Sequence, residues 1–212
     1  MPPGISVFDA ETDGDLLGIA ACGRAASGPV LWCGSGGLGR ALAAAAPART
    51  EPGLDGPVLG LFGSDHAATR RQLAACGPLW LRLDPAEGAA RLAAALAVQG
   101  AALASIALPD GLPRAEAARR IAQGFAALLR DLPRPGTLLV AGGETLAAIC
   151  ATLGATALEA KGLIGPGVPR AVLRGGRWDG LSLVSKSGAF GADTLWRDLL
   201  AANGFIQEHA LA

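Results

Sequence analysis

Short runs of Val, Leu and Ile alternate along this chain with longer segments whose apolar residues recur every three or four positions. The short runs are typical of buried strands, and the longer segments are typical of amphipathic helices. The predicted strands are residues 5–8, 30–33, 58–62, 79–83, 104–108 and 137–141, and the predicted helices are residues 13–22, 38–46, 67–76, 84–99, 113–130 and a segment ending at 154. Because strands that alternate with helices form βαβ units, this pattern predicts a mostly parallel sheet with helices on both faces.

The pattern changes after residue 154. Residues 158–164, 171–174 and 181–185 are predicted strands with no helices between them, and a final helix is expected over residues 193–203. The sequence therefore predicts an α/β fold: a three-layer α/β/α arrangement with a mostly parallel sheet and a small, partly antiparallel C-terminal element. A single domain over residues 1–212 is expected.

Composition excludes several classes of protein. The 212 residues include 18 basic and 18 acidic side chains, so the basic excess of a nucleic-acid-binding protein is absent. The hydrophobic content of 51% is too high for a disordered chain, and neither a transmembrane run nor a secretory signal is recognisable. The four cysteines lack CxxC spacing, and two histidines are too few for a typical zinc site. We expect a cytoplasmic protein with reduced thiols that binds neither nucleic acid nor membranes.

Four glycine-bearing loops follow predicted strands, at the sheet edge where open α/β sheets bind ligands. They are GSGGLG at 34–39, GSDH at 63–66, GGET at 142–145 and KSGAFG at 186–191. Glycine lets backbone amides approach an anion closely, and a following helix N-terminus favours negative charge. Lys186, one of only two lysines in the chain, begins the fourth loop. Each loop alone has an ordinary explanation in turn chemistry, but together they predict a site for an anionic ligand.

The first loop also matches G-x-G-x-x-G, the fingerprint of dinucleotide-binding folds. The acidic residue that such a site needs about 20 positions further on is poorly placed, because Glu51 and Asp55 fall in a Pro/Gly-rich crossing. An NAD-binding oxidoreductase module therefore stays an alternative to a phosphate site of another kind.

Other polar residues have ordinary structural explanations. Asp13 is interpreted as a helix cap and Asp15 as a first-turn charge, and no metal site is predicted because the acidic start lacks a ligand pattern. His66 is interpreted as a loop contact, since no serine or cysteine nucleophile stands in a recognisable elbow.

The order of the loops resembles the nucleotide-binding C-terminal domain of the four-carbon acid sugar kinases, from SVFDAETDGDL to KSGAFGADTL. That family has an aspartate-bearing strand before an acidic helix start, then segments of the types GSAGLA, GSxSxxTxxQ, GGDT, PGVP and KSGGFG. The matching positions here are Asp9 with residues 13–16, then 34–39, 63–72, 142–145, 166–169 and 186–191. The departures are GSGGLG for GSAGLA, His66 for the second serine, Glu144 for aspartate, and Leu163 for the acidic residue before PGVP.

The resemblance implies ATP-dependent phosphorylation of a hydroxyl group on an erythronate-, threonate- or oxo-tetronate-type acid. It implies ATP with Mg²⁺ carried by the nucleotide, and no metal site in the protein itself. The nucleotide-binding residues that it implies come from all four loops: Ser35, Gly36, Ser64, Gly142, Gly143, Glu144, Thr145, Lys186, Ser187 and Gly188.

Members of that family also have an N-terminal half with a DDxTGA-like motif, which binds the sugar acid and supplies the catalytic acid–base residue. This sequence has no such motif, so no catalytic residue is assigned. The chain is expected to bind nucleotide and to be inactive without a separate or missing sugar-acid-binding domain, and a homo-oligomer is compatible with this interpretation. A degenerate regulatory domain that binds no nucleotide is a further alternative, because His66 and Leu163 depart from the family pattern.

Overall fold

The computed structural model describes residues 4–43, 49–64, 66–84, 88–109 and 111–206. The chain forms two compact units, residues 1–48 (unit 1) and residues 49–212 (unit 2), and each is considered by itself. That both units form one nucleotide-binding domain stays a prediction. No helix in the described ranges combines the length and the apolar character needed to cross a membrane.

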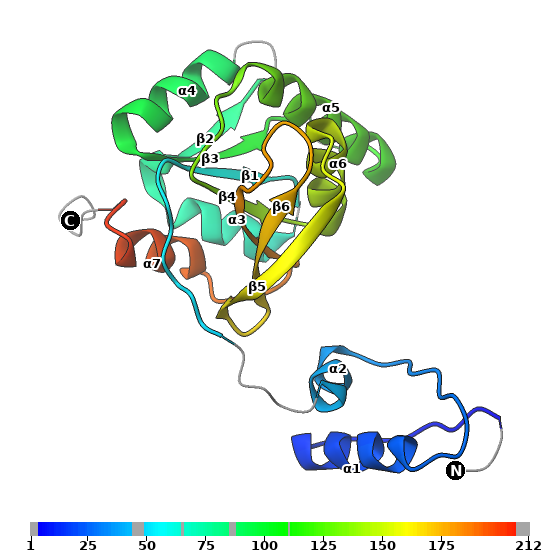
Figure 1. The fold of residues 1–212 in the computed structure, drawn as a ribbon. Helices are drawn as coiled ribbons and strands as arrows, with labels where there is room; N and C mark the ends of the chain where they lie inside the picture. The colour runs from blue at the N-terminus through cyan, green and yellow to red at the C-terminus, as the bar shows by residue number, and fades with distance from the viewer. Residues whose placement is uncertain (1–3, 44–48, 65, 85–87, 110, 207–212) are drawn as a thin grey trace. The chain divides into compact units, whose positions relative to one another are not determined.

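Unit 2 is built on a seven-stranded sheet of order β2-β3-β1-β4-β7-β6-β5 (Figure 1). Its strands are β1 (Val58–Phe62), β2 (Trp80–Leu83), β3 (Ala101–Ile106), β4 (Thr137–Ala141), β5 (Ala157–Gly165), β6 (Val168–Arg174) and β7 (Ser182–Lys186). The first five strands in this order run parallel, whereas β6 pairs antiparallel with both β7 and β5. The predicted mostly parallel sheet with a partly antiparallel C-terminal element is confirmed.

Helices cover both faces of this sheet, which confirms the three-layer arrangement (Figure 1). One face packs against α4 (Gly88–Gln99), α5 (Arg114–Asp131) and α6 (Gly143–Leu153). The other face packs against α3 (Ala67–Ala74), the short 3-10 helix η1 (Gly77–Leu79) and α7 (Leu195–Ala202).

The two covered faces explain why the central strands are continuous apolar runs. Every residue of β1 and of β4 is buried. In β1, Leu59 and Leu61 belong to the core beside α4–α6, while Val58 and Phe62 belong to the core beside α3 and α7. Because successive side chains of a strand point to opposite faces, a strand that is covered on both faces needs apolar residues at every position.

Unit 1 contains helices α1 (Asp13–Arg24) and α2 (Gly36–Leu42). The strands predicted at 5–8 and 30–33 are wrong for this structure, because neither segment pairs with any described residue in a ladder. The cap of α1 is Thr12, not Asp13: the Thr12 hydroxyl accepts from the Asp15 N–H, and the Asp15 carboxylate accepts from the Thr12 N–H at 2.8 Å. Part of the predicted helix 38–46 lies outside the described residues.

The predicted boundaries in unit 2 differ from the structure mainly where long-range pairing decides them. Strand β3 begins at Ala101, three residues before the predicted start, because Ala101 and Ala102 pair with Val58 and Leu59 of β1. Helix α7 begins at Leu195 and not at residue 193. Helix α4 is described from Gly88, whereas the predicted helix starts at residue 84, which is not helical; residues 85–87 lie outside the described residues.

Candidate functional site

Three of the four glycine loops lie at one edge of the sheet. Strands β1, β4 and β7 are neighbours and run parallel, so residues 63–66, 142–145 and 186–191 follow strands that end on the same side. The chain leaves β1 for α3 on one face of the sheet and leaves β4 for α6 on the opposite face. This divergence makes the β1–β4 edge a topological switch point, the usual place for a ligand in an open α/β sheet. Asp65, in the first of these loops, lies outside the described residues.

The three loops contact one another closely. A Cβ atom added at Gly63 would collide with the Thr145 hydroxyl, and one added at Gly188 would collide with the Ser64 hydroxyl. A Cβ atom at Gly142 would lie 3.7 Å from the Ser64 Cβ. Glycine at 63 and at 188 is therefore a requirement of the close approach between loops.

Gly142 sets the start of α6. Its φ of 105° is a conformation that residues with a side chain rarely adopt, and its N–H donates to the Lys186 carbonyl of the neighbouring strand at 3.1 Å. The N-cap residue of α6 is Gly142 itself, which has no side chain that could accept from the first N–H groups of the helix. The first N–H groups of a helix lack partners within the helix and carry its partial positive charge, so the 142–145 loop favours an anion.

Lys186 ends β7 beside these loops and is 4% exposed. Its ammonium donates to the carbonyls of Ser187 at 2.9 Å and of Gly188 at 3.1 Å, and it forms no ion pair with any described residue. Burial lowers the pKa of Lys186 from its usual 10.5 to about 8. At neutral pH the group is therefore a cation that is buried without a compensating carboxylate in the described part of the chain.

Polar side chains of α3 hold the 186–191 loop in place. The Gln72 amide donates to three successive carbonyls, those of Phe190 (3.0 Å), Gly191 (3.1 Å) and Ala192 (2.9 Å). The Thr69 hydroxyl donates to the Gly188 carbonyl at 2.9 Å. Both side chains are fully buried, beside Ala68 and Leu73 on the buried side of α3. The family motif over residues 63–72 contains both residues but gives neither a role. A polar side chain that is buried on a helix is the signal that indicates such a role.

His66 has a local structural role. It is the N-cap of α3, where its Nδ1 accepts from the Ala68 N–H at 3.2 Å, and its own N–H donates to the Ser64 hydroxyl at 3.3 Å. An Nδ1 that accepts a hydrogen bond carries no proton, so a neutral ring has its proton on Nε2. The interpretation of His66 as a loop contact is confirmed.

Ser35 and Gly36 belong to unit 1. Ser35 is the N-cap residue of α2, makes no capping hydrogen bond with its side chain, and follows a segment that is not a strand. A dinucleotide fingerprint requires a strand directly before the glycines, and this requirement is not met by the described residues. The described residues therefore lack the strand that an NAD site of this type needs. The role of Ser35 and Gly36 in a nucleotide site stays a prediction.

A cavity of about 330 Å³ opens at the carboxyl end of β3, the strand beside β1. It is mostly apolar and is lined by Ile106, Ala107, Leu108, Pro109, Arg120, Gln123 and Gly124. Ile121, which follows Arg120 on α5, lies against the 63–66 loop, because a Cβ atom at Gly63 would lie 2.8 Å from an Ile121 methyl group. Arg120 in the lining forms an ion pair with Glu116 at 2.6 Å. The other polar side chain of the lining is the Gln123 amide, which is neutral.

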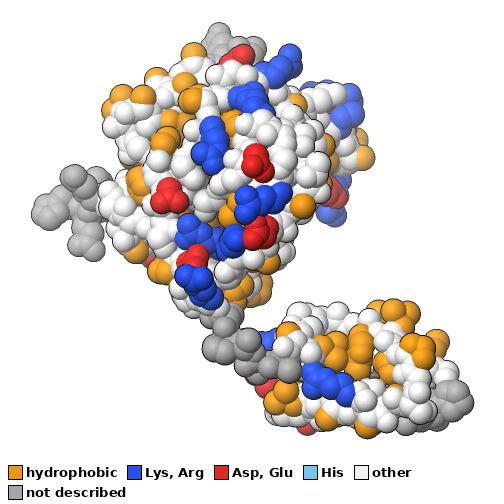
Figure 2. All heavy atoms as spheres, in the orientation of Figure 1, with side chains coloured by type: hydrophobic (Ala, Val, Ile, Leu, Met, Phe, Trp, Pro, Cys, Tyr) orange, Lys and Arg blue, Asp and Glu red, His pale blue; other side chains and the backbone are white. Residues whose placement is uncertain are grey.

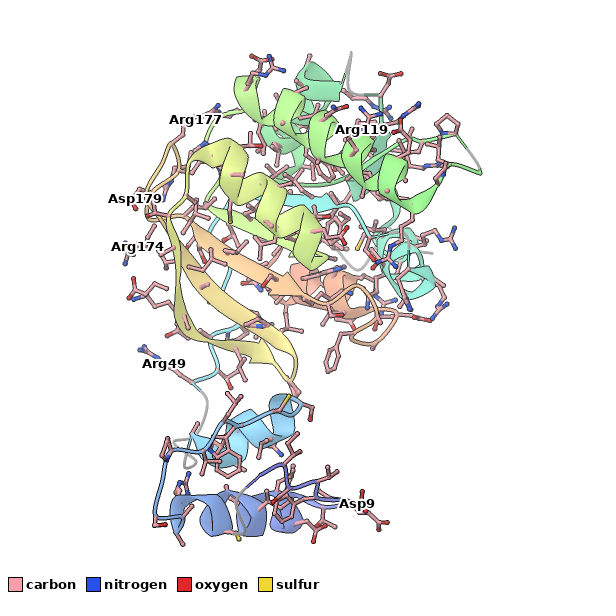
Figure 3. The ribbon with its side chains drawn as sticks, turned by 90° about the vertical axis from the view of Figure 1, so that its right-hand side faces the viewer. Asp9, Arg49, Arg119, Arg174, Arg177 and Asp179 are labelled. Atoms are coloured by element: carbon pink, nitrogen blue, oxygen red, sulfur yellow. The ribbon has the colours of Figure 1, made fainter. Side chains whose placement is uncertain are left out.

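Basic and acidic side chains are interspersed on the face of unit 2 shown in Figure 2. Several charged side chains of unit 2 have structural partners: Arg174 pairs with Glu159, and Arg177 donates to the Arg130 carbonyl at 2.9 Å (Figure 3). The Asp179 carboxylate accepts from the Gly175 N–H at 2.6 Å. In the described residues no group of three or more His, Cys, Asp or Glu side chains is arranged to hold a metal ion.

A family model described as "Nucleotide-binding C-terminal domain" matches residues 59–195, which include the sheet and its three glycine loops. Two curated relatives from Cupriavidus necator are named kinases of four-carbon acid sugars. The D-threonate kinase is 34% identical over 90% of this chain, and the 3-oxo-tetronate kinase is 31% identical over 94%. The chain belongs to this family, the nucleotide-binding C-terminal domains of four-carbon acid sugar kinases.

The chain spans about half the length of the curated relatives that it matches, 52% in both cases. It also matches a solved structure from Bordetella bronchiseptica, with 31% identity and a TM-score of 0.54 over 92% of this chain and 52% of that one. That protein is described as a domain of unknown function, crystallised as a domain-swapped dimer with bound citrate.

Proposed function

We propose that the loops after β1, β4 and β7 bind the phosphates of ATP, and that the chain is the ATP-binding part of a kinase. The acceptor would be a hydroxyl group of an erythronate-, threonate- or oxo-tetronate-type acid. The observation that carries the proposal is the buried Lys186 cation, which has no carboxylate partner among the described residues and lies where three glycine loops meet.

Each loop contributes a different kind of phosphate ligand. The backbone N–H groups of Gly143, Glu144 and Thr145 begin α6 and suit phosphate oxygens, and the Gly142 conformation sets the direction of that first turn. Lys186 contributes a full positive charge, and Ser64 contributes a hydroxyl donor.

The remaining predicted ligands complete this proposal. Ser187 and Gly188 follow the lysine, and Gly188 lies against the Ser64 side chain, while Ser35 and Gly36 of unit 1 stay predicted nucleotide ligands. A nucleotide fits these residues because the buried cation needs an anionic partner. Mg²⁺ would arrive with the ATP, since this ion is usually bound through substrate phosphates.

The cavity beside β3 suits the nucleoside part of ATP. It is one strand away from the 63–66 loop and two from the 142–145 loop, which corresponds to about 10 Å at the usual spacing between strands. An apolar lining matches the faces of a purine, and the Gln123 amide can both donate to and accept from its edge.

Phosphoryl transfer also requires a site for the sugar acid. The chain spans about half of the curated relatives, and we propose that the sugar acid and its catalytic acid–base residue are supplied by a further domain. Without that domain the chain would bind ATP and phosphorylate nothing efficiently. ATP as a ligand and exposed, unpaired Cys22 and Cys33 thiols favour the cytoplasm as its compartment.

Calorimetric titration of the purified chain with Mg²⁺–ATP tests the proposal. We expect saturable binding that is lost in Lys186→Met and weakened when Gly143 is replaced by a bulky residue. Lys161→Met is the matched control, because Lys161 is an exposed lysine paired with Glu159. Unchanged ATP affinity in both site variants would refute the assignment. Binding of NADH in preference to ATP would favour the oxidoreductase alternative, and binding of neither would favour a regulatory domain.

A further inference from the structure

Unit 1 exposes an apolar surface that its own helices do not cover. Ile5 is 97% exposed, Val7 is 87% exposed and Leu31 is 96% exposed. They lie in two short runs, ISVF at 5–8 and VLWC at 30–33. Side chains of this type are rarely left in water in a group, and a group of them marks an interaction site. Figure 2 shows hydrophobic side chains gathered on the visible face of unit 1.

The opposite side of the second run is packed. A Cβ atom at Gly23 of α1 would collide with the Trp32 ring, so this glycine allows Trp32 to lie directly against the helix. Val30 and Trp32 are half-buried, whereas Leu31 and Cys33 between and after them are exposed. This alternation has a period of two, which is the period of a strand with one face covered by helices.

The backbone of both runs lacks partners as well. Within the described ranges, residues 5–9 and 30–34 take part in neither a strand ladder nor another backbone hydrogen bond. Two runs with strand composition, the second also with strand periodicity, therefore carry N–H and C=O groups that lack partners among the described residues, beside exposed apolar side chains. A lipid surface or a helix could cover the side chains, but only a β-strand could also satisfy the row of backbone groups.

From this arrangement we infer that residues 5–8 and 30–33 are strands of an incomplete sheet, which is completed by strands of a second polypeptide. The occupant is the part of the longer kinases that this chain does not match. Two observations support this choice over a second copy of the chain. The curated relatives align with 90% and 94% of this chain, so they share unit 1, yet the nucleotide-binding family model begins only at residue 59. Unit 1 is thus a segment that these kinases retain outside the nucleotide-binding domain.

The inference goes beyond the proposed function, because it concerns an interface in unit 1 and not the phosphate loops. Its geometry follows from the three-layer rule for parallel sheets. Helices α1 and α2 supply one helical layer, the two runs supply part of the sheet, and the partner must supply further strands and cover the exposed face.

The test mixes the full chain with the unmatched part of the Cupriavidus necator D-threonate kinase, expressed as a separate polypeptide. The corresponding part of the Methylobacterium radiotolerans 3-oxo-tetronate kinase, whose whole sequence is 36% identical to this chain over 92% of its length, is a second probe. We expect a one-to-one complex by light scattering with at least one probe. Amide exchange should slow at residues 5–8 and 30–33, and the Cys33 thiol should lose reactivity while Cys22 on α1 retains it.

Leu31→Lys should weaken this complex at least tenfold, because it places a charge on the surface that the partner covers. Val98→Lys is the matched control, since Val98 is 83% exposed on α4 of unit 2. Absence of a complex with both probes, or exchange protection confined to unit 2, would overturn the inference. Self-association of the chain that protects the same residues would also overturn it, because the occupant would then be a second copy. ATP titration of each sample without partner tests the proposed function separately.

Discussion

Replacing Lys186 by methionine keeps most of the side-chain volume and removes the charge. In the wild-type protein the ammonium is 4% exposed, and its pKa is lowered from 10.5 to about 8. One pKa unit corresponds to about 1.4 kcal/mol, so holding the charge in this site costs the folded state about 3 kcal/mol at pH 7. Methionine does not carry this cost.

The substitution also removes two hydrogen bonds, but their acceptors keep other partners. The Ser187 carbonyl also accepts from the Phe190 N–H at 3.1 Å, and the Gly188 carbonyl also accepts from the Thr69 hydroxyl at 2.9 Å. Since neither carbonyl is left without a donor, each lost bond costs its net value of about 1 kcal/mol, which is about 2 kcal/mol for the two. We therefore expect Lys186→Met to be more stable than wild type by about 1 kcal/mol at pH 7 and to bind ATP at least tenfold more weakly.

The pH dependence of the free energy of unfolding provides a second test of this reasoning. Between pH 8 and 10.5 the unfolded chain keeps the lysine proton while the folded chain releases it, so wild type gains stability relative to the variant as pH rises. The difference in free energy of unfolding should move in favour of wild type by about 1.4 kcal/mol per pH unit in this window, so wild type becomes the more stable protein at its upper end. Urea unfolding at pH 7 and pH 9.5, with ATP titration at pH 7, measures both effects.

A variant that is less stable than wild type at pH 7 and binds ATP normally would refute the reasoning. That result would make Lys186 a structural residue whose hydrogen bonds outweigh its burial. Lys161→Met controls for the loss of a lysine charge elsewhere, because its ammonium is exposed. It should change neither stability nor affinity measurably.

Three further outcomes are expected. Gly142→Ala should destabilise the protein by about 1–3 kcal/mol in thermal unfolding because of the positive φ, whereas Gly143→Ala, in open space, should be tolerated. Gln72→Ala should weaken ATP binding several-fold by releasing three loop carbonyls, while Arg70→Ala, on the exposed side of α3, should not. At pH 8 a thiol reagent should modify the exposed Cys22 and Cys33 thiols. Burial raises the pKa of Cys76 to about 12, so Cys76 should react only when the protein unfolds. Rapid reaction of Cys76 in the folded protein would contradict its burial.

The sequence predicts the central strands β1 and β4 well because an apolar composition marks them along their whole length. The predicted bounds of β1 and β4 agree with the structure to the residue, since each is an apolar run with a proline or glycine close to each end. Strand β3 is harder to delimit, because it contains several alanines and alanine has a high helix propensity. Its start is decided by pairing with Val58 and Leu59, and such pairing is invisible in a local window.

The site shows the same division between local and long-range information. Glycines and Lys186 could be picked out because loop chemistry is local and lysine is rare in this chain. The function of Gln72 could not, because its three acceptors lie 118 to 120 residues further along the chain. The cavity at the end of β3 is likewise assembled from a strand end and a helix face, and no single segment of the sequence contains it.

The two strands that were predicted in unit 1 and are missing from it differ from these cases. Nothing in their composition is ambiguous: both runs are rich in β-branched and aromatic residues, and residues 30–33 alternate in exposure as a half-covered strand does. A strand, however, exists only when a neighbour accepts its hydrogen bonds, and no described residue of this chain does so. The pattern in ISVF and VLWC therefore indicates strands whose neighbouring strands belong to a partner. The residues that make the prediction fail within this structure are the ones that should become ordered strands when the remaining part of a four-carbon acid sugar kinase is present.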